Sequence, residues 1–285
     1  MCVTCGCGQT PATLLAPGDD DAHSHAQQSG HRHDDSCSHG HSHRHRHRTE
    51  ERTDTNLLAA LGRDARTIEI EMAVLSKNQA LAERNRGWFA GRGVFAMNLM
   101  GGPGSGKTTL LERSISELRG EVPISVVEAD QATAFDALRI RAAGASAIQV
   151  NTGAGCHLDA QMLAAALERL QPQAGSVLII ENVGNLVCPA LFDLGEAARL
   201  VIFSVTDGVD KPLKYPHMFR AADVLLISKI DLLPHLRIEL PQMIDNALKI
   251  NPKLLVFALS AENGQGMQSW CGWLRERWQV ARNAA

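Results

Sequence analysis

The stretch "GGPGSGKTTL", residues 101–110, decides the fold of this chain. It fits the pattern G-x-x-x-x-G-K-[ST] from Gly101 to Thr108, after an apolar run and at the start of a helical pattern. Glycines let backbone N–H groups surround phosphate oxygens, the lysine reaches the β- and γ-phosphates, and the hydroxyl ligates Mg²⁺. A chance glycine-rich turn is the alternative. The residues predicted to bind nucleotide here are Gly101, Gly104, Ser105, Gly106, Lys107 (also catalytic), Thr108 (also a metal ligand) and Thr109.

Apolar runs and helical patterns alternate along the rest of the chain. The apolar runs are nearly continuous, which is typical of strands covered on both faces. Strands are predicted at 94–100, 124–129, 146–150, 177–181, 200–205, 223–228 and 254–260. Helices are predicted at 107–118, 134–144, 158–170, 241–250 and 266–278. This alternation predicts an α/β fold, a doubly wound and mostly parallel sheet of the P-loop NTPase type.

Length and composition allow one sizeable core with appendages, since the chain has 285 residues, 45% of them hydrophobic. The formal net charge of −3 gives no reason to expect nucleic acid or a membrane surface as a partner. Nine of the twelve histidines lie between His23 and His47, in a segment almost free of large apolar residues. We therefore expect a disordered Cys/His-rich metal-binding tail at 1–56, a helical lead-in at 57–93 and a P-loop domain at 94–285.

Acidic residues end two of the predicted strands. "VVEAD" ends in Asp130, and "VLIIEN" carries Glu181. Ligands of open parallel sheets bind beyond the carboxyl ends of the strands, where a carboxylate can hold Mg²⁺ or orient the attacking water. We expect Asp130 to be catalytic and Glu181 to contribute to the nucleotide site. Solvated loop acids are the alternative for both residues.

A later strand end carries a pattern for guanine. "SKID", from Ser228 to Asp231, matches [NT]-K-x-D except for its first residue. The carboxylate can accept both N1–H and N2–H₂ of guanine, a donor pair that adenine lacks, and the Lys229 stem can lie along the base. "LSAENG" follows the next strand and places Ser260 and Ala261 where backbone groups can contact guanine O6. The combination favours GTP over ATP.

Soft metal ligands occur in two places. Cys156 and His157 are adjacent in "GAGCHLDA", and Cys188 follows Glu181 by seven residues. Thiolate and imidazole together suit Zn²⁺ or Ni²⁺. A buried small hydrophobic cysteine and a hydrogen-bonded histidine are the alternatives. Cys271 lies in an amphipathic stretch and is predicted to be core.

The N-terminus supplies the second set, Cys2, Cys5 and Cys7, in "MCVTCGCG". If Met1 is removed, the α-amino group of Cys2 becomes a fourth donor, which suits square-planar Ni²⁺ or tetrahedral Zn²⁺. No secretory signal pattern is present, so we expect a cytoplasmic setting in which clustered cysteines bind metal. A redox pair or an accident of the translation start are the alternatives, and Cys37 in the histidine tract could add a loose ligand.

These stretches together resemble the HypB family of nickel-incorporation GTPases, which assist maturation of [NiFe]-hydrogenases. The resemblance covers nearly the whole chain. It rests on the His-rich insert and on "CVTCGCG", "GGPGSGKTTL", "EADQAT", "NTGAGCHLDA", "ENVGNLVCP", "VTDGVDKPLKYP" and "SKIDLLP". The urease-accessory GTPases are close relatives, but the N-terminal C-x-x-C-G-C is not expected of them.

The resemblance implies a SIMIBI-like G-domain and roles that spacing alone does not supply. It implies a high-affinity nickel site at Cys2, Cys5 and Cys7. It also implies a zinc or nickel site at Cys156, His157 and Cys188, near a nucleotide-dependent dimer interface. Ser228 departs from the commonest guanine motif, but its small hydroxyl should preserve the turn. The histidine tract could store nickel, deliver it or be dispensable.

We therefore expect a cytoplasmic GTP-hydrolysing nickel metallochaperone that uses GTP and Mg²⁺ and handles Ni²⁺ and Zn²⁺. Its expected partners are a second copy of the chain, the hydrogenase large subunit and other maturation proteins. A metal-storage protein whose GTPase domain only controls assembly is the main alternative. A P-loop kinase of small metabolites is disfavoured by the guanine motif.

Overall fold

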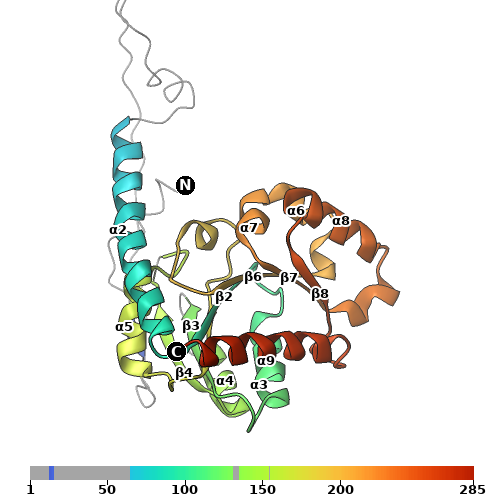
Figure 1. The fold of residues 1–285 in the computed structure, drawn as a ribbon. Helices are drawn as coiled ribbons and strands as arrows, with labels where there is room; N and C mark the ends of the chain where they lie inside the picture. The colour runs from blue at the N-terminus through green and yellow to red at the C-terminus, as the bar shows by residue number, and fades with distance from the viewer. Residues whose placement is uncertain (1–12, 16–64, 131–134, 154) are drawn as a thin grey trace, which may run out of the picture. The chain divides into compact units, whose positions relative to one another are not determined.

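The structure, a computed structural model, describes residues 13–15, 65–130, 135–153 and 155–285 (Figure 1). By its contacts the chain divides into two units, one comprising Met1–Pro17 with Met72–Ala285 and the other Gly18–Glu71. Of the second unit only residues 65–71 are described, as the first turns of a long helix. The sheet and every site below belong to the first unit.

A sheet of eight strands, in the order β1-β4-β3-β5-β2-β6-β7-β8, forms the framework of the first unit. Strands β2 to β8 all run parallel to their neighbours, whereas β1 pairs antiparallel with β4. Every residue of β2, β5 and β7 is buried, as the continuous apolar runs predict for strands covered on both faces. The strands are β1 (Thr13–Leu15), β2 (Phe95–Gly101), β3 (Ile124–Asp130), β4 (Ser146–Asn151), β5 (Val177–Glu181), β6 (Ala198–Ser204), β7 (Val224–Ser228) and β8 (Leu255–Ala258).

Helices cover both faces of the sheet. The first core cluster packs α3, α4 and α9 onto one face, and two further clusters pack the opposite face, one against α2 and α5 and one against α7 and α8 (Figure 1). The helices are α2 (Ala65–Ala90), α3 (Lys107–Glu117), α4 (Phe135–Ala143), α5 (Ala160–Leu170), α6 (Lys211–Lys214), α7 (Pro216–Ala221), α8 (Leu240–Ile250) and α9 (Met267–Asn283). Three 3₁₀ turns are η1 (Cys188–Leu191), η2 (Val205–Asp207) and η3 (Ile230–His235).

The doubly wound parallel α/β sheet predicted from the sequence is confirmed. All seven predicted strands and all five predicted helices of the P-loop domain are present, with ends that differ by a few residues. Strand β1 and the short helices α6 and α7 were not expected. Except for β1, the segment 1–56 lies outside the described residues. Within the described part of the chain, no helix is both long and apolar enough to span a bilayer.

Candidate functional site

The predicted phosphate-binding loop joins β2 to α3, so its backbone N–H groups stand at a helix N-terminus. Two glycines are required by this geometry. A Cβ at Gly101 would collide with the backbone oxygen of Ile202 in β6, and Gly106 has a φ of 93° that favours glycine. Ser105 is fully buried, and its hydroxyl donates to the Gly102 carbonyl at 2.8 Å, which closes the turn. The loop thus has the tight, glycine-dependent form that can surround a phosphate group.

Lys107 begins α3 and folds back over the loop. Its ammonium donates to the carbonyls of Gly101 and Gly102 at 3.4 and 3.3 Å. Burial lowers the pKa of Lys107, and the negative charge of nearby Glu181 opposes this shift. An ammonium held by two long contacts in a half-buried position can exchange them for phosphate oxygens.

Thr108 and Glu181 meet at the other side of the loop. The Thr108 hydroxyl donates to Glu181 Oε1 at 2.9 Å, whereas buried Glu181 Oε2 has no hydrogen-bond partner among the described residues. Burial raises the pKa of Glu181 to about 7, although Lys107 opposes the shift. A hydroxyl and an unsatisfied carboxylate oxygen are hard oxygen ligands, so these two side chains fit Mg²⁺.

A second glutamate lies beside this pair and was missed in the sequence. Glu128 of β3 stands opposite Glu181 of β5 in the parallel register, so both side chains point to the face covered by α3. Glu128 is buried, and its Oε2 also has no hydrogen-bond partner in the described part of the chain. Burial, followed by the charge of Glu181, raises the pKa of Glu128 to about 9. The site therefore concentrates carboxyl groups that a cation would satisfy.

These groups line one cleft of about 470 Å³ at the carboxyl edge of the sheet. Asp130 lies in it with the two glutamates, as do Asp136 and Arg139 from the first turns of α4. Arg139 holds Asp136 at 3.2 Å and forms two hydrogen bonds with Glu112 of α3, at 3.0 and 2.6 Å. The structure thus brings the predicted loop, Asp130 and Glu181 together around one cavity, with α4 at its border.

The guanine pattern is hydrogen-bonded directly to the phosphate-binding loop. Buried Ser228 donates its hydroxyl to the Ser105 carbonyl at 2.6 Å, and Lys229 donates its ammonium to the Gly104 carbonyl at 2.7 Å. Lys229 has a φ of 60°, a left-handed conformation that is uncommon for a residue with a side chain. The hydroxyl at position 228 therefore does more than fit the turn, because it satisfies a backbone oxygen of the loop.

Asp231, Ser260 and Ala261 lie beyond the ends of the neighbouring strands β7 and β8. The segment after β7 meets the segment after β8 where the Ile230 amide donates to the Leu259 carbonyl at 3.4 Å. Buried Asp231 Oδ1 has no partner among the described residues, which suits an oxygen that awaits donors from a base. These three residues do not line the 470 Å³ cleft, whereas Lys229 does. Lys229 thus stands between the phosphate cleft and the predicted base contacts.

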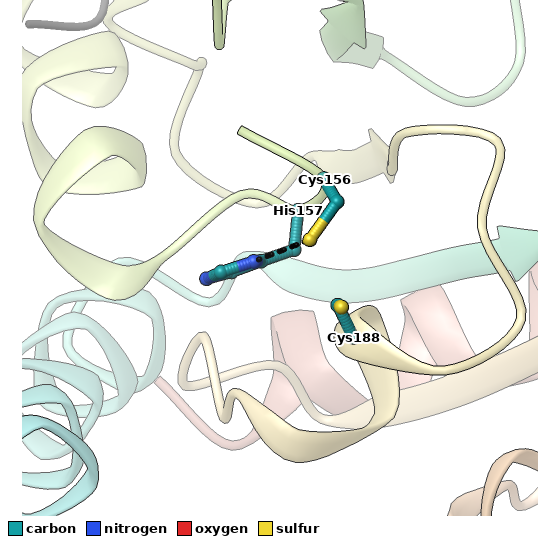
Figure 2. Close-up of side chains that lie close together, drawn as sticks. All are labelled: Cys156, His157 and Cys188. Atoms are coloured by element: carbon teal, nitrogen blue, oxygen red, sulfur yellow. Dashed lines mark hydrogen bonds between the residues drawn. The ribbon is translucent and has the colours of Figure 1, made fainter. Parts of the chain in front are cut away.

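Cys156, His157 and Cys188 converge at a second place, shown in Figure 2. One ligand atom from each residue lies within 4.8 Å of the others, and Cys156 Sγ is 3.6 Å from His157 Nδ1. Ligand atoms of a tetrahedral zinc site with bonds of 2.0–2.3 Å are separated by about 3.3–3.8 Å. The three side chains therefore need only a small movement to bind one Zn²⁺ or Ni²⁺ ion, and they leave a fourth position open.

The histidine is held in a ligand-competent state. Its ring stacks on Phe192, with ring centroids 3.8 Å apart and planes inclined by 21°. Burial lowers the pKa of His157, although Asp159 opposes the shift. A neutral imidazole can bind a metal ion without first losing a proton.

Residues 95–258 match the family described as CobW/HypB/UreG, nucleotide-binding domain. The chain is 45% identical over 286 residues to the hydrogenase maturation factor HypB of Escherichia coli K12, covering 96% of this chain and 98% of that protein. The chain belongs to the HypB family. It is also 56% identical over 209 residues to HypB of Rhizobium leguminosarum bv. viciae, covering 73% of this chain and 70% of that one.

A solved HypB structure has the same fold. The crystal structure of HypB from Helicobacter pylori in complex with nickel is 37% identical, with a TM-score of 0.67 over 72% of this chain and 96% of that chain. The predicted resemblance to the HypB family is thus confirmed. The match over 95–258 spans the phosphate loop, the Cys-His-Cys cluster and the guanine pattern.

In this HypB-family chain one loop runs from the nucleotide cleft to the Cys-His-Cys cluster. It starts at Glu181 and ends at Cys188. Asn185 forms an isolated antiparallel bridge with Gly101 of the phosphate loop, and its side-chain amide donates to the Cys156 carbonyl at 3.4 Å. Gly184 packs against Pro103, which an added Cβ would approach to 3.2 Å. The two sites are therefore connected by direct backbone and side-chain contacts.

Some predicted ligands of the HypB-family chain lie outside the described residues, namely Cys2, Cys5, Cys7, Cys37 and the histidine tract. Other residues at the sites were missed. Glu128 could have been found, because it precedes Asp130 by two positions on one strand and so points to the same face. Asp136, Asn185 and Phe192 give no such signal, since only the folded chain brings them to the sites.

Proposed function

We propose that the chain is a GTP-hydrolysing nickel metallochaperone that assists nickel insertion into [NiFe]-hydrogenase. One observation carries the proposal: a nucleotide cleft and a Cys-His-Cys cluster lie in one folded unit, joined by the loop from Glu181 to Cys188. The names of the HypB relatives support the link to hydrogenase maturation. The proposal keeps the predicted parts, a metal-binding tail at 1–56, a helical lead-in at 57–93 and a GTPase domain at 94–285.

The nucleotide chemistry follows from the cleft. Lys107 neutralises negative charge on the β- and γ-phosphates. Thr108 and Glu181 would hold Mg²⁺, which would supply charge neutralisation at the transferring phosphate. Asp130 lies at the same cavity, where its carboxylate would orient the attacking water or contribute to holding the metal ion. Hydrolysis then resets a switch: the loops near Asp130 and Glu181 are ordered when GTP is bound and are released after hydrolysis.

Selectivity for GTP rests on Asp231. Its unsatisfied buried oxygen accepts from the Watson–Crick edge of guanine, and the Lys229 stem lies along the base. The backbone groups of Ser260 and Ala261, in the turn after β8, contact O6 of guanine. Adenine offers no matching pair of donors, so ATP leaves the carboxylate unsatisfied at a cost of about 1.5–3 kcal/mol per lost bond.

The metal ion is the cargo of the protein. Three ligands from Cys156, His157 and Cys188 leave one position open, as in sites where the metal ion exchanges ligands. A ligand from a second copy of the chain or from an acceptor protein can enter this position. We propose that a homodimer forms on nucleotide or metal binding and that the hydrogenase large subunit and other maturation proteins are the acceptors or partners.

The proposal is tested by titrating the full-length protein with Ni²⁺ and Zn²⁺, with and without a non-hydrolysable GTP analogue. We expect the analogue to change nickel affinity or the rate of nickel transfer to a chelator by about fivefold or more, the lower range of coupling between sites. Identical affinities and rates in both states would contradict the chaperone function and favour metal storage. An ATP analogue serves as the control for base selectivity.

A further inference from the structure

The buried face of α2 is unusual because half of it is polar. At positions spaced like one face of a helix, it carries Asn78, Ala82, Asn85 and Phe89, all buried. The two asparagines are 7% and 5% exposed. A helix that only needed to cover the sheet would carry apolar residues at such positions, since a buried amide stabilises the fold only when its hydrogen bonds are satisfied.

Both amides form hydrogen bonds, and each reaches two separate segments of the chain. Asn85 donates through Nδ2 to the carbonyls of Ala160 and Leu194, at 3.0 and 3.1 Å. Asn78 accepts from the Ala160 amide at 2.9 Å and donates to the Asp193 carbonyl at 2.7 Å. The two asparagines therefore connect the first residue of α5 to the segment that follows η1.

These are the two segments that carry the Cys-His-Cys cluster. Ala160 follows His157 by three residues, whereas Asp193 follows Cys188 by five. Phe192, next to Asp193, stacks on the His157 ring at a centroid distance of 3.8 Å. The bonds to α2 thus lie a few residues from every ligand of the cluster, on both loops.

Two further contacts fix the segment that follows η1 against α2. Arg86 forms hydrogen bonds to both carboxylate oxygens of Asp193, at 3.0 and 2.8 Å. Gly195 lies so close to α2 that an added Cβ would come within 2.7 Å of the Arg86 amide nitrogen and 2.9 Å of the Asn85 Cβ. The helix and the loop therefore pack backbone against backbone at this point.

We propose that α2 is a positioning element of the metal centre: Asn78 and Asn85 set the separation between the Cys156–His157 segment and the Cys188 segment. The proposal rests on the proposed function, because it takes the cluster to bind metal. Apolar packing alone would let α2 slide along the two loops, whereas paired amide bonds define one register. The two segments also touch each other through the stack of His157 on Phe192 and the hydrogen bond from Asn185 to the Cys156 carbonyl. The amides of α2 add a shared support that keeps the three ligand atoms within reach of one ion.

The test measures metal binding in the full-length chain with Cys2, Cys5, Cys7 and Cys37 replaced by alanine. Thiolate-to-metal charge-transfer absorption on adding Co²⁺ or Ni²⁺ then reports the Cys156 and Cys188 thiolates, and the histidine tract gives no such band. Asn85→Ala is compared with this parent. We expect metal binding about tenfold weaker, in the range found when groups that orient metal ligands are removed, with a changed band shape. We expect GTP-analogue affinity within twofold of the parent.

Asn246→Ala is the matched control. Asn246 is a helical asparagine of α8, 7% exposed, and its amide donates to a loop carbonyl, that of Val209, at 3.0 Å. Its side-chain hydrogen bonds join Val209 and Lys249, which lie outside the metal-ligand segments. Its replacement should therefore lower stability similarly and leave metal affinity unchanged. Equal metal affinity in Asn85→Ala and the parent would overturn the proposal. An equal loss in Asn246→Ala would overturn it too, because the effect would then follow from general destabilisation.

A milder variant decides the question if Asn85→Ala does not fold. Arg86→Ala removes both bonds to Asp193 from a partly exposed position and spares the buried amides. We expect about threefold weaker metal binding, and unchanged binding would count against the proposal. If the parent itself shows no thiolate-to-metal band, the metal-binding part of the proposed function fails as well. A band in the parent that no variant alters would reject only the role of α2.

Discussion

Asp231 is the residue on which nucleotide choice should depend. Asp231→Asn replaces a carboxylate oxygen with a donor that faces the donors of guanine. Because a hydrogen bond to a charged group contributes about 1.5–3 kcal/mol, we expect GTP affinity to fall by about tenfold or more. Xanthosine triphosphate, which has an acceptor at that edge, should compete better against the variant than against the parent. Competition binding with both nucleotides measures this, and parental GTP affinity in the variant would refute the guanine assignment.

Cys271 gives a second prediction at the scale of one residue. It lies on the buried face of α9 and is 3% exposed, in the core as predicted, and burial raises the pKa of its thiol to about 11. At pH 8 the raised pKa leaves almost no thiolate, which is the reactive form. We expect iodoacetamide to label the partly exposed Cys156 and Cys188 in the metal-free folded protein well before Cys271.

Mass spectrometry of the digested protein measures that order of labelling. Denaturant should abolish the difference, because an unfolded Cys271 regains an ordinary pKa. Early labelling of Cys271 in the folded protein would show that the α9 face opens readily.

The first turn of α3 holds the two side chains to which we assign the hydrolysis of GTP. Thr108→Ala removes the hydroxyl that contacts Glu181, and Lys107→Ala removes the ammonium over the loop. We expect each change to lower the rate of GTP hydrolysis by 100-fold or more, the size of effect seen when one electrostatic contact to the transition state is lost.

Thr108→Ser is the control for that prediction, since it keeps the hydroxyl and should retain most activity. Circular dichroism and thermal unfolding verify that the variants fold. A folded Thr108→Ala variant with near-parental turnover would contradict the assignment of Mg²⁺ to this hydroxyl.

The junction of β7 with the phosphate loop gives another prediction. Ser228→Ala leaves the buried Ser105 carbonyl without the hydroxyl that donates to it at 2.6 Å. An unsatisfied buried acceptor costs about 1–3 kcal/mol, so unfolding free energy should fall by that amount and GTP affinity should weaken. Ser228→Thr keeps the hydroxyl and should behave like the parent. Chemical denaturation and nucleotide binding measure both effects, and a neutral alanine variant would mean that water replaces the bond.

The elements were predictable where one physical signal dominated. Seven apolar runs gave seven strands, because strands covered on both faces need continuous apolar sequence. Helices α6 and α7 were missed because four and six residues are too few to show a helical period, and each has a proline in its first turn. Glu128 could have been found from its spacing to Asp130 on the same strand, but its place opposite Glu181 is visible only in the folded sheet. The sequence gives no sign that Asn78 and Asn85 of α2 are buried, because their hydrogen-bond partners lie far away along the chain.

At the scale of the whole molecule, metal binding should divide between two parts of the chain. Replacing Cys2, Cys5 and Cys7 by alanine should remove one tight Ni²⁺ equivalent while GTP binding stays intact, because these residues precede the GTPase domain that we propose at 94–285. Ligands must lose protons, so affinity at the cysteines should fall as the pH drops below the thiol range.

Deleting residues 23–47 should instead lower the stoichiometry and spare the tight equivalent, since neutral imidazoles outside a preformed site bind weakly. Competition with a chelator of known affinity measures the nickel affinity and stoichiometry of both variants. Tight binding that survives the cysteine changes and disappears with the histidine tract would reverse the assignment.

The bridge between Gly101 and Asn185 has a thermodynamic consequence. The protein can be empty, bound to nucleotide, bound to metal or bound to both, and these four states form a closed thermodynamic cycle. The effect of nucleotide on metal affinity therefore equals the effect of metal on nucleotide affinity. If GTP loosens nickel by some factor, nickel must loosen GTP by that factor as well. An ion held at Cys188 would then set how much nucleotide the protein keeps at a given GTP concentration. The concentration of metal would thereby govern the fraction of the protein that is bound to GTP, through the loop from Glu181 to Cys188.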